Sequence, residues 1–229
     1  MAIGRLPQNC IVVSRSSIIR SFYGSCGPTT CSVCASVRLL LPPTQIIISR
    51  SIRTWPATWC LTDINQLWVG DITYIRLRQE FIYLAALLDA YSRRCIGWAL
   101  ARYLDARLPL AALQMALQTR SFQPGQLTHH SDRGVQYASK EYVQVLQENE
   151  IIISMSRIGN PYDNAKAERF MRTLKYEEIY MNDYDTFAEV LCSMEHFIEA
   201  VYNRKRLHSA LGYVSPAEFE ASLPLRNQP

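Results

Sequence analysis

The sequence predicts an α/β fold in which a mixed five-stranded sheet is flanked by helices. The main reason is the order of the periodic segments: three strands, a helix, a strand, a helix, a strand and then two helices. The first three strands are joined by short polar turns, which predicts an antiparallel meander. With 229 residues, 48% of them hydrophobic, the chain is long and apolar enough to bury one substantial core.

The strands are recognised by β-branched and aromatic content or by uninterrupted apolar character. Residues 66–77 alternate apolar and polar side chains, and residues 81–88 are nearly all apolar, as in a strand buried on both faces. A third strand covers residues 95–100, and polar turns at 78–80 and 89–94 connect the three. Two shorter strands are expected at residues 127–131 and 151–154.

The helices are bounded by capping and breaking residues. The first covers residues 108–119, before Pro124 and Gly125, and Ser139 caps a second that runs to residue 148. A third begins near Ala165 after a cap at Asp163 or Asn164, and a long fourth covers residues 186–203. A capping box at Ser215-Pro-Ala-Glu218 starts a last helix.

Residues 1–60 differ from the rest of the chain. They contain six arginines and five of the seven cysteines, but no lysine, histidine, aspartate or glutamate. Two interpretations compete: a basic arm that touches nucleic acid, or an out-of-frame translation, which we favour. We expect little stable structure there, and no zinc site at Cys31 and Cys34, because a second CxxC pair is missing. The predicted organisation is this atypical segment, a catalytic core at residues 61–221 and a tail at 222–229.

The charge and hydropathy limit the functions that are expected. The net charge is +4, but residues 1–60 carry +6 and the rest −2, so any DNA binding by the core must come from local patches. No apolar run approaches the roughly 20 residues of a membrane span, and the first residues lack a signal-peptide pattern. These features predict a soluble, cytoplasmic protein without membrane partners.

Three acidic residues are candidates for chemistry. Asp71 lies in mid-strand among apolar neighbours, Asp132 follows a strand and Glu168 lies early in a helix, so all three can converge at one edge of the sheet. Close carboxylates stay charged only beside a cation, and Mg²⁺ prefers such oxygen ligands. Taken singly, they also fit an edge-strand acid, a turn residue and a salt-bridge partner.

Several neighbouring residues have two interpretations each. Glu168, Arg172 and Lys175 share one helix face, so Lys175 meets a DNA phosphate or the face is an internal salt bridge. Asp89 is a turn cap or a fourth acid near the metals. His130 is interpreted as a neighbour of the site, and His129 as a core residue.

Five motifs carry a resemblance to a known family. They are Trp68-Val-Gly-Asp71-Ile-Thr-Tyr-Ile75, Leu88-Asp-Ala-Tyr-Ser-Arg-Arg94, His130-Ser-Asp132-Arg-Gly134, Gly159-Asn-Pro-Tyr-Asp-Asn-Ala-Lys-Ala-Glu168 and Tyr202-Asn-Arg204 with His208-Ser-Ala-Leu-Gly. From about Asn65 to Phe219 the chain resembles the integrase-core transposases of the IS-three insertion-sequence family, relatives of retroviral integrases. The 35 residues between Asp132 and Glu168 match the family's DDE pattern.

The resemblance implies a ribonuclease H-like fold, with Asp71, Asp132 and Glu168 as catalytic acids that bind two Mg²⁺ or Mn²⁺ ions. It implies DNA strand cleavage by water, then attack of the freed 3′-hydroxyl on target DNA. The implied partners are transposon ends, target DNA and further copies of the chain, in the bacterial nucleoid. Lys175, Arg172 and Arg204 are the expected DNA contacts.

The family's usual helix-turn-helix region is not recognisable in residues 1–60. Two other functions therefore stay open. One is a ribonuclease H-like nuclease on the same fold. The other is a catalytically silent, truncated transposase that inhibits by binding DNA or a full-length transposase.

Overall fold

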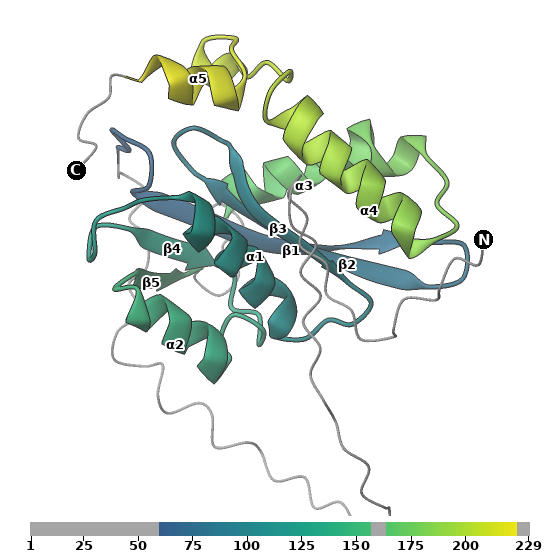
Figure 1. The fold of residues 1–229 in the computed structure, drawn as a ribbon, viewed down its shortest axis with the longest axis horizontal. Helices are drawn as coiled ribbons and strands as arrows, with labels where there is room; N and C mark the ends of the chain where they lie inside the picture. Colours follow the sequence, from purple (N-terminus) through teal and green to yellow (C-terminus); the bar gives the residue numbers. More distant parts are fainter. Residues whose placement is uncertain (1–59, 157–163, 224–229) are drawn as a thin grey trace, which may run out of the picture.

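A five-stranded mixed sheet forms the centre of the protein (Figure 1). The computed structural model describes residues 60–156 and 164–223. The strand order is β3-β2-β1-β4-β5, so the first strand of the chain lies in the middle of the sheet. The predicted mixed five-stranded sheet is confirmed.

The first three strands form the predicted antiparallel meander. They are β1 (Leu67–Arg76), β2 (Phe81–Asp89) and β3 (Cys95–Ala101). The Leu77 N–H donates to the carbonyl of Glu80 at 2.8 Å, which closes the first turn. β4 (Thr128–Ser131) pairs in parallel with β1, and β5 (Ile152–Met155) pairs in parallel with β4. Each parallel pair is joined by a long crossover connection that contains a helix, because a short turn can join only antiparallel strands.

Two helices cover one face of the sheet: α1 (Arg107–Thr119) and α2 (Lys140–Glu148). The predicted cap of α2 is confirmed, since the Ser139 side chain accepts a hydrogen bond from the Tyr142 N–H. α1 lies directly on β3 at Gly97, where an added Cβ would come within 2.1 Å of the Ala112 carbonyl oxygen. Only glycine permits this close approach of helix and strand.

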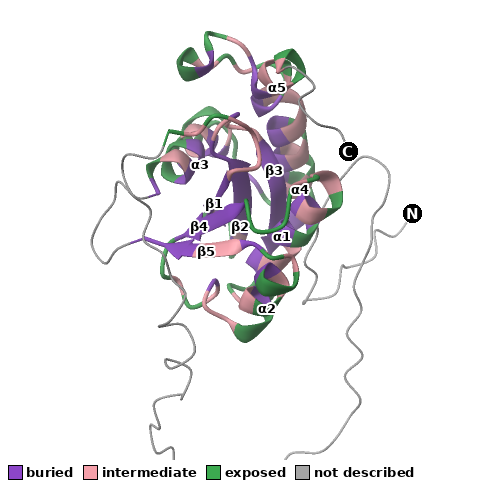
Figure 2. Ribbon diagram, turned by 90° about the vertical axis from the view of Figure 1, so that its left-hand side faces the viewer, coloured by how far each residue is buried: buried purple, intermediate pink, exposed green. Residues whose placement is uncertain are grey.

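The opposite face carries α3 (Ala165–Glu177), the short η3 (Ile179–Met181), α4 (Phe187–Glu195) and η4 (His196–Tyr202). The long fourth helix predicted at residues 186–203 is present in extent, and Thr186 caps it in a capping box with Glu189. Its second half, η4, is π-helical, which the sequence pattern did not indicate. Figure 2 shows most of the sheet in the colour of buried residues, with part of β5 in that of intermediate burial.

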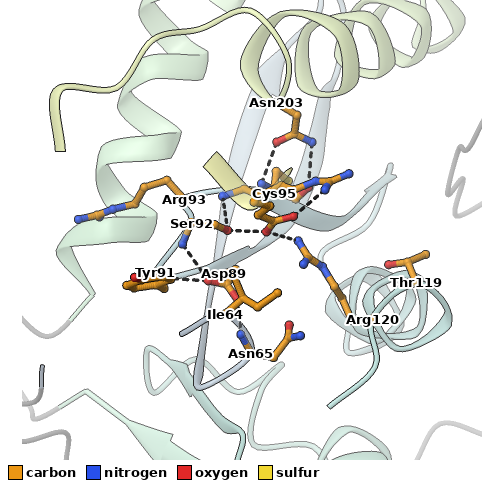
Figure 3. A network of polar contacts seen from close by, with 12 residues as sticks. Ile64, Asn65, Asp89, Tyr91, Ser92, Arg93, Cys95, Thr119, Arg120 and Asn203 are labelled. Carbon is orange, nitrogen blue, oxygen red and sulfur yellow. Dashed lines mark hydrogen bonds and ion pairs between the residues drawn. The ribbon is translucent and has the colours of Figure 1, made fainter. Parts of the chain in front are cut away.

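The C-terminal part of the chain is attached to the turn between β2 and β3 (Figure 3). The side chain of Asn203 accepts from the Cys95 N–H and donates to the Cys95 carbonyl, both at 3.0 Å. After η5 (Ser209–Leu211), α5 (Pro216–Ser222) begins with the predicted capping box. From α5, Glu220 accepts hydrogen bonds from Ser92, Arg94 and Arg120.

Three segments lie outside the described residues: 1–59, 157–163 and 224–229. They include most of the atypical N-terminal segment, Cys31 and Cys34, and the proposed cap residue Asp163. Among the helices that the structure describes, none is both long and apolar enough to cross a membrane.

Candidate active site

Asp71 in β1 and Asp132, directly after β4, lie at matching positions along two neighbouring parallel strands. The paired register of β1 and β4 ends at Val69 and His130, and each aspartate comes two residues later. By strand alternation the Asp71 side chain points to the same face as Val69 and Ile75, which pack in the core cluster that contains α3. The sheet therefore directs Asp71 toward the helix that carries Glu168.

A hydrogen bond from Asn164 connects the start of α3 to β1. Its side-chain amide donates to the Gly70 carbonyl at 3.1 Å, and Asn164 is buried. The Glu168 N–H in turn donates to the Asn164 carbonyl at 3.1 Å, which is the first turn of the helix. Glu168 therefore lies one helical turn after the residue whose side chain bonds to Gly70, the neighbour of Asp71.

Asp163 or Asn164 was the predicted cap of α3, and Asp163 lies outside the described residues. Asn164 occupies the cap position, but its side chain makes no capping hydrogen bond. The amide is used for the contact with β1 instead. The sequence did not predict this role. A short polar side chain at the start of a helix looks the same whether it caps the helix or bonds to a neighbouring strand.

Asp132 and Glu168 lie close enough to Asp71 for their charges to act on its carboxylate. The pKa of Asp71 is raised from 3.8 to about 6, mainly by burial and further by the negative charges of Asp132 and Glu168. The Ile72 N–H, which donates to the Asp71 carboxylate at 2.8 Å, and the positive charge of Lys175 act in the opposite direction. Asp132 and Glu168 are exposed, whereas Asp71 is half-buried.

The donor set suits a hard divalent cation in its chemistry, because it consists of carboxylate oxygens whose mutual repulsion a cation relieves. In residues 60–156 and 164–223, however, no three His, Cys, Asp or Glu side chains lie close enough together to hold one ion. In the described residues the acids are therefore connected through the effect of their charges on the pKa of Asp71, and not through a metal-binding cluster. The segment that joins β5 to α3, residues 157–163, is outside the described residues.

The cations of α3 contact aromatic rings. The Lys175 Nζ lies 4.9 Å from the ring centroid of Tyr74 on β1, and the Arg172 guanidinium lies 5.6 Å from that of Tyr176. No ion pair joins Glu168 to either cation within the described part of the chain, so the internal salt-bridge interpretation has no support there. Arg204, the third expected DNA contact, is exposed directly after the buried Asn203.

The two histidines of β4 are buried and bonded. The Tyr142 hydroxyl lies 2.9 Å from His129 Nε2, and burial lowers the pKa of His129 to about 3. His129 is thus the predicted core residue. His130 lies 2.9 Å from the Ser154 hydroxyl and 3.1 Å from that of Ser156, so its ring is fixed against β5.

Asp89 is a turn residue, as the first of its two interpretations had it. It is fully buried, and its carboxylate accepts the N–H groups of Asn65, Tyr91 and Ser92. Burial raises its pKa despite these donors. The carboxylate shapes the connection between β2 and β3 (Figure 3).

Comparison with known proteins agrees with this architecture. Two integrase core domain models match residues 62–161 and residues 149–216. The transposase for insertion sequence element IS904 of Lactococcus lactis is 41% identical over 159 residues, which cover 69% of this chain and 62% of that protein. The transposase InsF for IS3A of Escherichia coli is 41% identical over 156 residues, 68% of this chain and 54% of that protein. The chain thus spans less than two thirds of the length of these relatives.

Solved structures with lower identity share the fold. A chain of the simian T-cell lymphotropic virus intasome has a TM-score of 0.57 at 18% identity, over 72% of this chain and 57% of that one. The catalytic domain of Mos1 mariner transposase has a TM-score of 0.50 at 10% identity, over 59% and 71%. The fold is the ribonuclease H-like fold of integrase and transposase catalytic cores. The chain belongs to the integrase core family, among the insertion-sequence transposases of the IS3 (IS-three) type that its motifs resemble.

Proposed function

We propose that this chain is the catalytic core of a DNA transposase, which cleaves a DNA strand with water and joins the freed 3′-hydroxyl to a target phosphodiester. The observation that carries the proposal is the match of this chain to integrase core domains and insertion-sequence transposases, with Asp71, Asp132 and Glu168 on elements around the centre of the sheet. Three acids and one cation from β1, the end of β4 and α3 suit the handling of a phosphodiester.

In this proposal Asp71, Asp132 and Glu168 hold two Mg²⁺ or Mn²⁺ ions. When bound, such ions activate the attacking oxygen and stabilise the leaving oxygen of a phosphodiester displacement. The all-oxygen donor set favours this assignment, as does the raised pKa of Asp71. The core of HTLV-2 integrase, which shares the fold with a TM-score of 0.51 over 68% of this chain and 96% of that one at 12% identity, has been solved with magnesium.

The protein residues have separate tasks. The half-buried Asp71 is fixed by the strand, and the Asn164 bond to Gly70 keeps Glu168 close to it. Lys175, held over Tyr74, and Arg172 bind phosphates of the DNA as positive charges, and Arg204 extends the contact beyond η4. In the assembled protein we propose several copies of the chain on DNA, in the bacterial nucleoid.

A strand-transfer assay tests the proposal. The full chain is incubated with Mg²⁺ or Mn²⁺ and with labelled oligonucleotides that carry the ends of the element from which the gene comes. We expect cleavage and joining by the wild-type protein and neither with Asp132→Asn, while Asp132→Asn keeps the circular-dichroism spectrum and the melting temperature of the wild type. The matched control is Asp183→Asn, which neutralises an exposed acid beyond η3.

The same assay separates the alternatives. Cleavage of RNA–DNA hybrids without joining would indicate a ribonuclease H-like nuclease. DNA binding with no cleavage by the wild type under either metal would indicate a silent inhibitor. Cleavage that survives in Asp132→Asn would contradict the assigned catalytic acids.

A further inference from the structure

A second group of basic residues surrounds a pocket on another face of α3. The pocket has a volume of about 150 Å³ and lies between the first half of α3, the turn before β3 and the segment that follows η4. Since a water molecule occupies roughly 30 Å³ in the liquid, this space suits a group of several heavy atoms.

The lining of the pocket is strongly cationic. It includes Arg93, Lys166, Arg169 and Arg206, and no acidic side chain lines it. Within residues 60–156 and 164–223, only Arg206 of these four has an ion pair, with Glu177 at 2.5 Å. The positive charges of three side chains are therefore left without a carboxylate partner in the described structure.

Two nitrogens of the lining also lack a hydrogen-bond partner in the described structure. They are Nε of Arg206 and Nε2 of His208, and both atoms are buried. Burial, together with the charges of Arg206, Arg93 and Arg169, lowers the pKa of His208 to about 4. The buried Arg206 N–H without an acceptor is costly, and an anion with several oxygens supplies acceptors to it and to the Nε2–H tautomer of His208.

The backbone holds Arg93 in an unusual conformation at the edge of this pocket. Its φ is 63°, in the left-handed region that few non-glycine residues adopt. The Tyr202 hydroxyl donates to its carbonyl at 3.1 Å, which fixes this turn against η4. Figure 3 shows the side chain pointing away from Asp89 and Ser92, and it lines the pocket instead.

The pocket is distinct from the face that carries Glu168 and Lys175. At about 100° per residue, Lys166 and Arg169 lie roughly 100–160° around α3 from Glu168. One helix therefore presents two charged faces. The first belongs to the proposed catalytic site, and the second has no role in it.

We propose that the pocket bound by Arg93, Lys166, Arg169, Arg206 and His208 seats a phosphate group of the DNA backbone, as a second DNA anchor on the far side of α3. This inference rests on the proposed function for its ligand, which is DNA. The pocket holds the duplex by charge and by hydrogen bonds, so its contribution is independent of DNA sequence.

The test measures DNA binding as a function of salt, by fluorescence anisotropy with a labelled duplex and the full chain. Each phosphate contact adds about 0.9 to the slope of log K against log salt. The double variant Arg93→Gln/Arg169→Gln should lower the slope by about 0.9, because the pocket seats one phosphate. Arg107→Gln/Lys140→Gln, the matched control on the α1 and α2 face, should leave the slope unchanged. Arg169→Lys, which keeps the charge, should also keep the slope.

A second arm uses inorganic phosphate alone. At equal ionic strength, phosphate in place of chloride should raise the melting temperature of the wild type and of the control variant more than that of the pocket variant, whose rise is only the general effect of phosphate. This larger rise without a change of DNA slope would mean a site for free anions and would overturn the proposal. A lower slope without the larger rise would overturn it too, because the cations would then act only at long range.

The failure of this inference differs from that of the proposed function. A wild-type protein without salt-dependent DNA binding contradicts both. If Lys175→Ala lowers the slope but Arg93→Gln/Arg169→Gln does not, the proposed function stands and the pocket assignment is wrong.

Discussion

The side-chain amide of Asn164 and the backbone carbonyl of Gly70 form a hydrogen bond of 3.1 Å, which joins the start of α3 to the residue before Asp71. This bond joins the helix that carries Glu168 to the strand that carries Asp71, since Glu168 follows Asn164 by one turn. A side chain on a helix can act together with one on a strand only if the helix is held in a fixed position against that strand.

Asn164→Ala should therefore reduce strand transfer by about tenfold or more, since a small misplacement of catalytic groups has large effects on rate. Its stability should fall by only about 1–2 kcal/mol, as expected for the loss of one buried hydrogen bond. Single-turnover rates and denaturant unfolding measure the two effects. Asn182→Ala, which removes an exposed amide bonded to Glu178, is the control. Equal rates for both variants would show that the tether does not position Glu168.

The half-buried charge of Asp71 should cost stability in the absence of metal. Its pKa is raised from 3.8 unfolded to about 6 folded, so wild-type stability falls as pH rises between these values and the full cost remains above pH 6. At pH 7.5 in EDTA, Asp71→Asn should be more stable than wild type by about 1–3 kcal/mol. A less stable variant would contradict this.

Added Mg²⁺ provides a second measurement on the same pair of proteins. An ion that binds only the folded state raises its stability with concentration. The melting temperature of the wild type should rise with millimolar Mg²⁺, and that of Asp71→Asn should not. Asp183→Asn is expected to follow the wild type. A rise of equal size in all three proteins would place the ion elsewhere.

Lys175→Ala should lower the salt slope of DNA binding by about 0.9, because one cation is withdrawn from the phosphates. Lys175→Arg should retain the slope. Since Lys175 also lowers the pKa of Asp71, its removal should move the acid limb of the cleavage–pH profile upward. A packing role over the Tyr74 ring alone would change neither the slope nor the profile.

Glu220 should contribute strongly to stability from the last helix. Its side chain is 9% exposed and pairs with Arg120, which is 11% exposed, and with Arg94, each at 2.6 Å. Glu220→Ala leaves buried positive charge uncompensated and should cost about 3 kcal/mol by chemical denaturation. Glu218→Ala on the same helix removes an exposed capping residue and should cost about 1 kcal/mol. Equal costs would argue against the buried network.

His129 should make the protein sensitive to acid. Its pKa is about 3 in the folded state and about 6.5 in the unfolded state. Between these pH values only the unfolded state binds the proton. The contribution of His129 to the free energy of unfolding is complete above pH 6.5. It declines by about 1.4 kcal/mol for each pH unit below that value. The pH dependence of unfolding should be shallower in His129→Gln than in the wild type by one proton. Equal pH dependence in wild type and His129→Gln would contradict the shift.

The elements of this fold follow closely from local pattern. The apolar run at residues 81–88 predicted a strand buried on both faces, and β2 is buried from Leu84 onward. Ser139, Thr186 and Ser215 cap their helices as expected. The strand order was beyond such reasoning, because local periodicity does not say that β4 joins the sheet at β1 and not at β3.

The sequence predicted the acids of the candidate site, but not the residues that position them. Asp71 was conspicuous as a carboxylate within an apolar strand, whereas Asn164 had the signature of an ordinary cap. The basic pocket was not predicted, because its residues come from a turn, a helix and the chain after η4, and meet only in three dimensions. The π-helical half of the fourth helix has the same apolar spacing as an α-helix over so few residues.

The attachment of α5 to the turn before β3 has a consequence for biosynthesis. Ser92 and Glu220 form a hydrogen bond although 128 positions separate them in the sequence. Asn203 bonds to the backbone of Cys95, 108 positions away. A ribosome must therefore release nearly the whole domain before these contacts form, which delays completion of the native state. During that interval Arg94 and Arg120 have no carboxylate from α5. We therefore expect slow docking of the last helix to leave the nascent sheet open to chaperones and proteases for longer.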